Sequence, residues 1–504
     1  MKKIALFLSI VVAAIACEQA EPVTPPEFDF ANPDVVIPYQ GSEDEGLKVE
    51  FKTNVDWTAE LDQAYDWVTI TPKSGVAGDA VITVVATPNK DAAERTAVIK
   101  VTAGVSILTF DVVQEGYPAL TISPRELNFD STGGSQEVTV TANVEYVVTM
   151  TKNDWLTYKF NAEKSAYTLT AAANEGYGPR SALVTLLNNV DGVADTLVVN
   201  QTGRVSVLWE KAFADYSEIT PGNPLHLAYK DGMILLSTGA AVHALKADDG
   251  SYAQAVTLPD GFVVSSMTSD DAGNVVVAGD IAFGASGDVY AVTSLTETTP
   301  VKVATLSHVD VWSNTAGNIR AGGDVTKNGV VTMVVDVSQY WIGCDIVDGV
   351  AGATKFGGLA NPDGSTLWSV QNGCVAPLGN KLEEGLLATF YTCPALYSSN
   401  ASGEWVAVGG TQFNGNDNNC AISEAVYGGT HYAAVAVGSH FDYTKARVCL
   451  FDLTTNEMVY SYTVAGGHSN AGPTADVILV PTDDALYVYY ADLNRGAIVC
   501  AQVK

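Results

Sequence analysis

The chain has 504 residues, of which 47% are hydrophobic and 16% charged, so it holds enough apolar material for several buried cores. Val, Thr, Ala, Gly and Tyr are abundant, and long runs with the 3.6-residue period of a helix are absent after the first segment, which predicts an all-β protein. With 57 acidic against 26 basic residues the net charge is −31, and such a surface repels phosphate backbones, which argues against a nucleic-acid partner.

Residues 1–16 have the features of a bacterial secretion signal. Two lysines form a basic start, and the apolar stretch 4–15 is too short to span a membrane stably. The stretch ends in AIAC at 14–17, which resembles a lipobox, although Ala14 stands where leucine is commoner. The resemblance implies cleavage before Cys17 and attachment of lipid to its sulfur. The alternative is an ordinary signal peptide followed by a chance cysteine.

The residues after the signal favour the outer membrane. Glu18 rather than aspartate follows the cysteine, so the simplest signal for retention in the inner membrane is missing. Residues 17–30 are acidic and rich in proline, which predicts a semi-extended tether that holds the next domain away from the membrane. We therefore expect a lipid-anchored outer-membrane protein that faces outward at the cell surface, the periplasmic orientation being the alternative.

Two related units follow, at residues 31–117 and 118–203. The first contains N-x-x-W, D-W-x-T-x-x-P-x-S-G, R-x-A-x-I and Q-x-G motifs, which begin at 54, 66, 95 and 114. Matching landmarks recur in the second unit, about 87 residues later, at 143–146, 154–155, 180–183 and 200–203. Each unit has six or seven short alternating runs, which predicts two immunoglobulin-like β-sandwiches.

These landmarks resemble the BACON domain, the Bacteroidetes-associated carbohydrate-binding, often N-terminal module. The second unit departs from the pattern, because it lacks the P-x-S-G turn and has Tyr146 where the first has Trp57. The resemblance implies a contact with glycans. Trp57, Trp67 and Trp155 nevertheless lie in strand-like runs, so we predict that they pack in the cores and that the sandwiches serve chiefly as spacers. Sugar binding by the sandwiches themselves is the alternative.

Residues 204–504 contain a repeat. VHALKADDGS (242–251), VYAVTSLTET (289–298) and VCLFDLTTNE (448–457) share an alternating apolar run and a polar turn, and the chain ends on VCAQVK (499–504). The copies begin 47 residues apart (242 to 289), then 159 (289 to 448, three steps of 53) and 51 (448 to 499). A period of about 50 residues with several strands in each unit predicts a six-bladed β-propeller.

The repeat also predicts where each strand lies. If the repeated run is the third strand of a blade, the second strands lie at 233–237, 274–279, 330–337, 385–391, 431–437 and 485–490. The last blade has no fourth strand after the final copy. The segment 205–213 is expected to supply it and so to close the ring, which removes an exposed sheet edge.

Large side chains gather in the loops after these second strands, although such residues usually prefer burial. Aromatic rings there would stack on sugar rings, and polar groups would bond hydroxyls. The predicted ligand-binding residues are Phe283, Tyr340, Trp341, Tyr397, His440, Phe441, Tyr443 and Arg495. We add His226 and Arg320, which we expect in loops that lead into the innermost strands. The alternative is that all of these side chains pack the blade ends.

The sequence thus predicts a non-catalytic lipoprotein that captures a polysaccharide or glycoprotein glycan for a neighbouring outer-membrane uptake system. The glycan assignment comes from the BACON resemblance together with the aromatic loops. One alternative is a protein–protein scaffold or adhesin. Another is a glycan-cleaving enzyme that uses two carboxylates among Asp324, Asp336, Asp345 and Asp476. No motif selects such a pair, and aspartate is common in turns.

We expect neither a metal nor a cofactor. The sequence has no C-x-x-C pair and no H-x-x-x-H or H-E-x-x-H motif, and the Asn-rich stretch 414–419 is better explained as a polar turn than as a calcium loop. Six cysteines lie between 344 and 500. Cys449 and Cys500 occupy one position of the repeat and are predicted to be buried thiols, while disulfides among the six are left open.

Overall fold

The computed structural model describes residues 25–504 apart from 31–34, 43–44, 153, 164, 223, 239–240, 261, 280–285, 297–298, 308–315, 336–339, 360–372, 391–392, 400–402, 414–416, 440–446, 464–474 and 494–495. The regular secondary structure of the described residues is strand, apart from two short 3₁₀ helices, η1 (Phe213–Asp215) and η2 (Leu382–Glu384). The chain divides into two compact units. The first comprises Met1–Ala173 and Ser181–Gln201, and the second comprises Asn174–Arg180 and Thr202–Lys504.

The first sandwich consists of two sheets with the strand orders β1-β3-β7-β5 and β2-β9-β8-β4-β6. Its strands are β1 (Phe28–Phe30), β2 (Val35–Ile37), β3 (Leu47–Thr53), β4 (Trp57–Leu61), β5 (Val68–Thr71), β6 (Ser74–Gly75), β7 (Gly78–Ala86), β8 (Arg95–Ala103) and β9 (Ser106–Gln114). The alternation seen in the sequence is the alternation of burial, since Ile82 and Val84 on one sheet and Ile99 on the other are fully buried. These inward faces form one core.

The second sandwich repeats this plan with sheets ordered β10-β12-β15-β14 and β11-β17-β16-β13. Its strands are β10 (Leu120–Ser123), β11 (Glu126–Phe129), β12 (Gly134–Ala142), β13 (Val147–Met150), β14 (Leu156–Phe160), β15 (Ala166–Ala171), β16 (Arg180–Leu187) and β17 (Ala194–Gln201). Trp57, Trp67 and Trp155 are only 4%, 7% and 5% exposed. The prediction that these rings pack in the cores is therefore confirmed.

The shared Q-x-G motif has a structural explanation. Gln114 is fully buried, and its amide donates to the carbonyls of Pro38 (3.2 Å) and Thr87 (3.0 Å). Gln201 makes the equivalent pair of bonds in the second sandwich. A Cβ on Gly116 would lie 2.0 Å from the carbonyl oxygen of Ala92, so only glycine fits. The motif closes the end of each sandwich and gives no information about a ligand.

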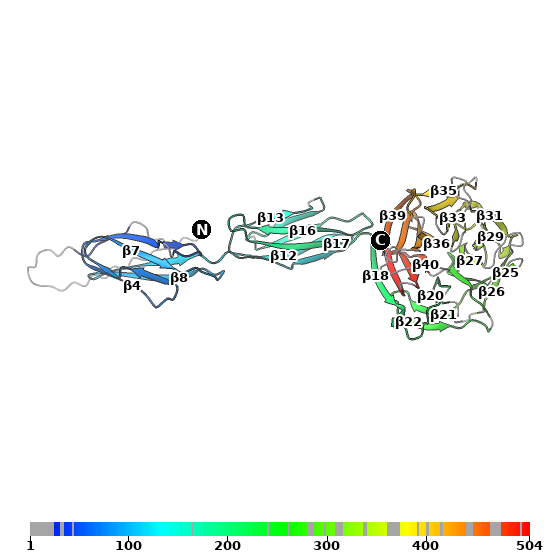
Figure 1. Cartoon of the computed structure of the whole chain (residues 1–504), viewed down its shortest axis with the longest axis horizontal. Coiled ribbons are helices and arrows are strands. Elements are labelled where there is room, and N and C mark those ends of the chain that lie inside the picture. Colours follow the sequence, from blue (N-terminus) through cyan, green and yellow to red (C-terminus); the bar gives the residue numbers. More distant parts are fainter. Residues whose placement is uncertain are drawn as a thin grey trace, which may run out of the picture. The chain divides into compact units, whose positions relative to one another are not determined.

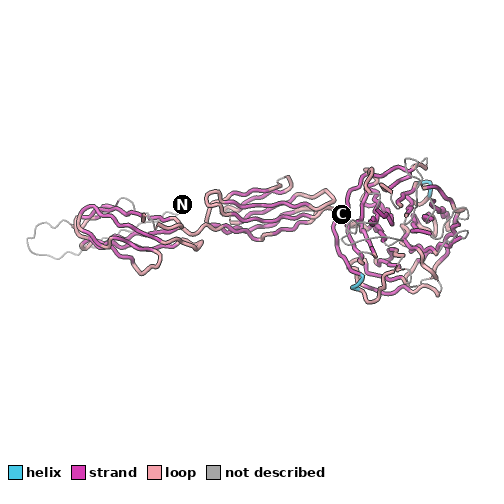
Figure 2. Tube along the Cα trace, in the orientation of Figure 1, coloured by secondary structure: helices cyan, strands magenta, loops and turns pink. Residues whose placement is uncertain are grey.

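The second unit contains six groups of antiparallel strands within its described residues (Figures 1 and 2). Their strands run in chain order from the innermost outward, and neighbouring innermost strands contact each other around a closed ring. The six innermost strands are β19 (His226–Lys230), β23 (Ser266–Ser269), β27 (Ala316–Gly323), β32 (Cys374–Pro377), β36 (Asp417–Tyr427) and β40 (Ala475–Pro481). We call this arrangement the ring.

The second strands occur where the repeat predicted them, and so do the strands of the four repeat copies. The second strands are β20 (Met233–Ser237), β24 (Val275–Ala278), β28 (Gly329–Val335), β33 (Leu386–Thr389), β37 (Thr430–Ser439) and β41 (Leu486–Asp492). The third strands are β21 (Val242–Lys246), β25 (Ser286–Val292), β29 (Tyr340–Val347), β34 (Leu396–Ser399), β38 (Arg447–Asp452) and β42 (Ala497–Val503).

The outermost strands complete the ring. They are β22 (Tyr252–Val256), β26 (Val301–Ser307), β30 (Val350–Ala351) with β31 (Lys355–Gly358), β35 (Trp405–Val408) and β39 (Glu457–Thr463). In the last group the outermost strand is β18 (Val205–Ala212), which pairs with β42 from Val205 opposite Val503 to Ala212 opposite Ala497. The predicted closure of the last group by the segment 205–213 is therefore confirmed.

Five cysteines of the ring are buried and keep their thiols: Cys344, Cys374, Cys393, Cys449 and Cys500. The predicted burial of Cys449 and Cys500 is confirmed, and none of these five takes part in a disulfide. No helix within the described residues is long and apolar enough to cross a membrane.

Candidate functional site

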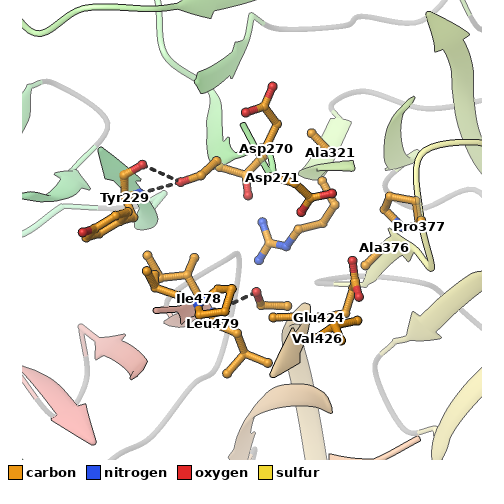
Figure 3. Close-up of a pocket in the computed structure, with 18 of the residues that line it drawn as sticks. Tyr229, Asp270, Asp271, Ala321, Ala376, Pro377, Glu424, Val426, Ile478 and Leu479 are labelled. Atoms are coloured by element: carbon orange, nitrogen blue, oxygen red, sulfur yellow. Dashed lines mark hydrogen bonds between the residues drawn. The ribbon is translucent and has the colours of Figure 1, made fainter. Parts of the chain in front are cut away.

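A cavity of about 540 Å³ lies at the centre of the ring (Figure 3). Every one of the six innermost strands, or the turn that directly follows it, contributes to its wall. The lining residues are Tyr229, Thr268–Gly273, Arg320, Ala321, Ala376–Gly379, Ser423–Val426, His431 and Ile478–Pro481. The cavity therefore lies at the end of the ring where innermost strands turn into second strands. We call it the axial cavity, and its volume lies in the range of small-molecule sites.

The turn after β23 brings two carboxylates to the wall. Asp270 is buried and accepts hydrogen bonds from the backbone N–H of Asn274 (2.7 Å), the Asn274 side-chain amide (2.8 Å) and the Val325 N–H (2.9 Å). Gly273 within this turn has φ of +77°, a conformation that favours glycine. Asp270 thus fixes the turn and leaves the next residue, Asp271, as the carboxylate available to a ligand.

Asp271 accepts one described hydrogen bond, from the N–H of Gly323 at 2.6 Å. Partial loss of hydration in the cavity raises the pKa of Asp271 to about 6, with further increases from the charges of Glu424 and Asp270, while the Gly323 bond and the charge of His431 oppose the shift. Asp271 is therefore ionised at pH 7, but its charge is poorly compensated. An ionised carboxylate offers about four acceptor positions, so most of those on Asp271 can serve a ligand.

A second set of ionisable side chains on the cavity wall comes from the fifth group of strands. Glu424 on β36 and His431 on β37 are hydrogen-bonded through Oε2 and Nε2, and their side chains are 11% and 28% exposed. Tyr229, near the end of β19, also lines the wall, and its half-buried ring packs against the neighbouring hydrophobic core. Figure 3 shows Tyr229, Asp271 and Glu424 arising from separate segments around the cavity.

Arg320 lies at the inner end of the axial cavity and is 3% exposed. Its guanidinium donates to the Ile422 carbonyl on β36, to the Ile319 carbonyl (2.8 Å) and to Oδ1 of Asp476 on β40. Burial alone would lower the pKa of Arg320, but the Asp476 carboxylate outweighs it and holds the pKa above its ordinary value. Arg320 is therefore charged, and its charge is neutralised by Asp476.

Asp476 extends this network to the first part of the ring. Its Oδ2 accepts the N–H of Leu227 on β19 at 2.8 Å and lies 3.9 Å from Nδ1 of His226. Burial lowers the pKa of His226 to about 4, although Asp476 opposes the shift, so the imidazole is neutral at pH 7. One buried ion pair thus connects innermost strands β19, β27, β36 and β40.

The structure places His226 and Arg320 differently from the prediction. Both were expected in loops leading into the innermost strands, but they lie on β19 and β27 and are almost completely buried. Arg320 still reaches the axial cavity, whereas His226 does not line it. Their burial follows from the ion pair, because Asp476 can be buried only beside a cation and hydrogen-bond donors.

The predicted aromatic loops are only partly described. Tyr340 and Trp341 were expected in a loop but are the first two residues of strand β29. Tyr340 is 39% exposed and lies edge-on to Phe356, while Trp341 packs partly buried over Gly357. Tyr397 lies on β34, is 2% exposed and stacks on Phe390, so the expectation that it projects from a loop is wrong. Phe283, His440, Phe441, Tyr443 and Arg495 lie outside the described residues, as does Cys17.

The aspartates proposed for catalysis do not meet in the axial cavity. Asp324 accepts bonds from Thr326 and Lys327 in its own turn, and Asp345 accepts bonds from Lys355 and the Leu382 N–H. Asp476 is paired with Arg320, and Asp336 lies outside the described residues. No group of three or more His, Cys, Asp or Glu side chains within the described chain could hold a metal ion.

Sequence reasoning missed Tyr229, Asp271, Glu424 and His431. It looked to the loops at the other end of each blade, because ligands commonly lie there. A usable signal was present: acidic residues follow or end two innermost strands, in SDDAGN (269–274) and SEAV (423–426). That signal becomes specific only when the ring brings the two segments together.

Comparison with known families identifies the first part of the chain. Residues 55–115 match the BACON model, described as "Putative binding domain, N-terminal", and residues 119–204 match the BACON_2 model, described as "Viral BACON domain". The chain therefore carries two tandem domains of BACON type, as the landmarks predicted. No curated protein matches the chain.

Similar solved structures add little. Endo-fucoidan hydrolase MfFcnA4, from glycoside hydrolase family 107, is 15% identical, with 36% of this chain and 29% of that chain covered and a TM-score of 0.16. The titin domains z1z2 in complex with telethonin are 18% identical, with 35% and 95% covered and a TM-score of 0.17. Titin-A168169 is 13% identical, with 35% and 98% covered and a TM-score of 0.23. Likeness at this level carries no argument about function.

The ion pair generates a stability prediction. Arg320→Met leaves Asp476 buried without its cation, which should lower the free energy of unfolding of the ring by about 3–5 kcal/mol. The matched control is Lys327→Met, since Lys327 is 75% exposed and solvent screens its pair with Asp324, which should contribute little to stability. Hydrogen exchange of β19 and β27 amides in increasing urea measures both. Equal losses in the two variants would show that the ion pair does not support the ring.

Proposed function

We propose that this protein is a non-catalytic, glycan-binding lipoprotein of the cell surface, and that its ring is a six-bladed β-propeller which holds the sugar in the axial cavity. The observation that carries the proposal is the combination of Tyr229 with the carboxylates of Asp271 and Glu424 on the cavity wall. An aromatic ring stacks on the apolar face of a sugar, while carboxylates accept hydrogen bonds from its hydroxyl groups.

Charge narrows the glycan class. The chain carries a net charge of −31, and the axial cavity itself is rich in carboxylates. Sulfated or uronic-acid-rich polysaccharides are repelled by such a surface. A neutral or amine-bearing glycan, either a polysaccharide or a glycoprotein chain, fits the proposal better than an acidic one.

The remaining parts of the chain have supporting roles in this proposal. The BACON-type sandwiches act chiefly as spacers, because their repeated tryptophans are buried. Cys17 carries the lipid anchor in the outer membrane, and the captured glycan passes to a neighbouring uptake system.

Fractionation of cells tests the anchor: Cys17→Ser should move the protein from the membrane to the soluble fraction, and an unchanged membrane fraction would contradict it.

Affinity electrophoresis of the full chain through gels with neutral, amine-bearing or sulfated polysaccharides tests glycan binding. Glu424→Gln should abolish retardation or weaken it about tenfold or more, because a charged hydrogen-bond partner is lost. Glu457→Gln, an exposed residue on the outermost strand β39, is the matched control and should bind normally.

Other results of these binding experiments would distinguish the alternative sites and functions. Retardation that survives Glu424→Gln but disappears in Trp341→Ala would place the site in the loops at the opposite end of the ring. Retardation by no glycan, together with capture of a defined protein partner, would favour a scaffold or adhesin. Release of reducing sugar that stops in Asp271→Asn would favour a glycan-cleaving enzyme.

A further inference from the structure

More side chains that can carry negative charge than positive charge line the axial cavity. The turn after β23 supplies Asp270 and Asp271, and β36 supplies Glu424. Two groups that can carry positive charge face them, Arg320 on β27 and His431 on β37. The lining residues of β19, β32 and β40 are uncharged.

Both potential cations are already engaged. The Arg320 guanidinium is bound to Asp476, which lies behind it and does not line the cavity. His431 is bound to Glu424. Lys230 is close to the wall, but its Nζ donates to the Gly273 carbonyl at 2.9 Å and lies 3.7 Å from Asp231. A net excess of negative charge therefore faces the interior of the cavity.

This excess of negative charge acts on Asp271. It forms no ion pair with a cation among the described residues. Its pKa is raised by lost hydration and by the charges of Glu424 and Asp270, while the Gly323 N–H and the nearby His431 oppose the shift. Asp271 is exposed to the cavity, so a cation that entered would relieve this repulsion without displacing a protein partner. Near a protein surface such a charge pair changes affinity by about tenfold or more.

We propose that the axial cavity selects sugars with a free, protonated amino group, so that the ligand end it holds is a de-N-acetylated hexosamine. The inference rests on the proposed function, since it concerns the sugar that the same cavity binds. In this arrangement Tyr229 stacks on the sugar ring, and Asp271 and Glu424 face its ammonium group and neighbouring hydroxyls. The cavity volume of about 540 Å³ admits the end of a chain and excludes most of a polymer.

The experiment is isothermal titration of the full chain at pH 7 with the tetramer of glucosamine and the tetramer of N-acetylglucosamine. The two have the same rings and linkages but differ in charge. The glucosamine tetramer should bind at least about tenfold more tightly. Asp271→Asn should reduce this preference to less than about twofold, while Glu457→Gln should keep it. Asparagine at 271 can still accept the Gly323 hydrogen bond, so the variant should fold.

The pH dependence gives a second readout. Asp271 loses its charge as pH falls below about 6, so affinity for the glucosamine tetramer should fall there, and it should fall again at high pH when the sugar amine loses its proton. The ionisable groups that face Asp271 are Asp270, Glu424 and His431. They are unchanged in Asp271→Asn, which should lose most of the acid limb.

Other results of the titrations would contradict the selection for amines, glycan binding as a whole, or the assignment of the ligand as a sugar. Equal affinity for the two tetramers, with both weakened in Glu424→Gln, would overturn the selection for amines and leave glycan binding in place. Binding of neither tetramer, together with no retardation by any glycan gel, would overturn both proposals. A pentalysine peptide that binds as tightly as the glucosamine tetramer would show that the cavity recognises charge on a protein partner rather than an amino sugar.

Discussion

The buried ion pair between Arg320 and Asp476 is the constraint on which the ring and its cavity depend. Both side chains are almost completely shielded from water, and charges buried in this way are tolerated only when hydrogen bonds satisfy them. The necessary partners come from four of the six innermost strands. The pair therefore fixes the relative positions of strands that are as much as 249 residues apart, as between Leu227 and Asp476. It also gives the cavity a polar inner end whose charge is already neutralised.

This arrangement explains why the Asp271 carboxylate on the cavity wall is available to a ligand. If Asp271 lay beside an unpaired arginine, an internal salt bridge would occupy it. Because Asp476 takes the charge of Arg320, the cavity retains an excess of negative charge. The sandwiches show the opposite design: their landmark residues, such as Gln114 and Trp67, satisfy internal hydrogen bonds or fill the core. Recognition of the BACON landmarks therefore identifies a scaffold more securely than a binding site.

Most of the ring could be predicted from the sequence because its strands repeat at a nearly constant interval. The copy at 242, the final copy at 499 and the closing strand β18 were all placed correctly. The third part of the ring shows no clean repeat, because its outer edge is built from the short strands β30 and β31, both of which pair with β29. Tyr397 was assigned to a loop because no copy of the repeat marks the third strand of the fourth group, β34, which begins at Leu396.

The candidate site could not be predicted in the same way. Asp271 and Glu424 are separated by more than 150 positions in the sequence, and an aspartate in a turn has no distinctive local pattern. Arg320 was singled out as polar, but its partner Asp476 was treated as an unrelated candidate acid. Only the closed ring makes them neighbours, since non-local pairing depends on the topology of the whole unit rather than on the sequence near each residue.

The most direct test of the account is a crystal structure of the full chain with a bound oligosaccharide chosen from the glycans that retard it. The account predicts electron density for the sugar in the axial cavity, with a ring against Tyr229 and polar groups within hydrogen-bond distance of Asp271 and Glu424. Density only at the opposite end of the ring beside Tyr340 and Trp341, or only on a sandwich, would contradict it.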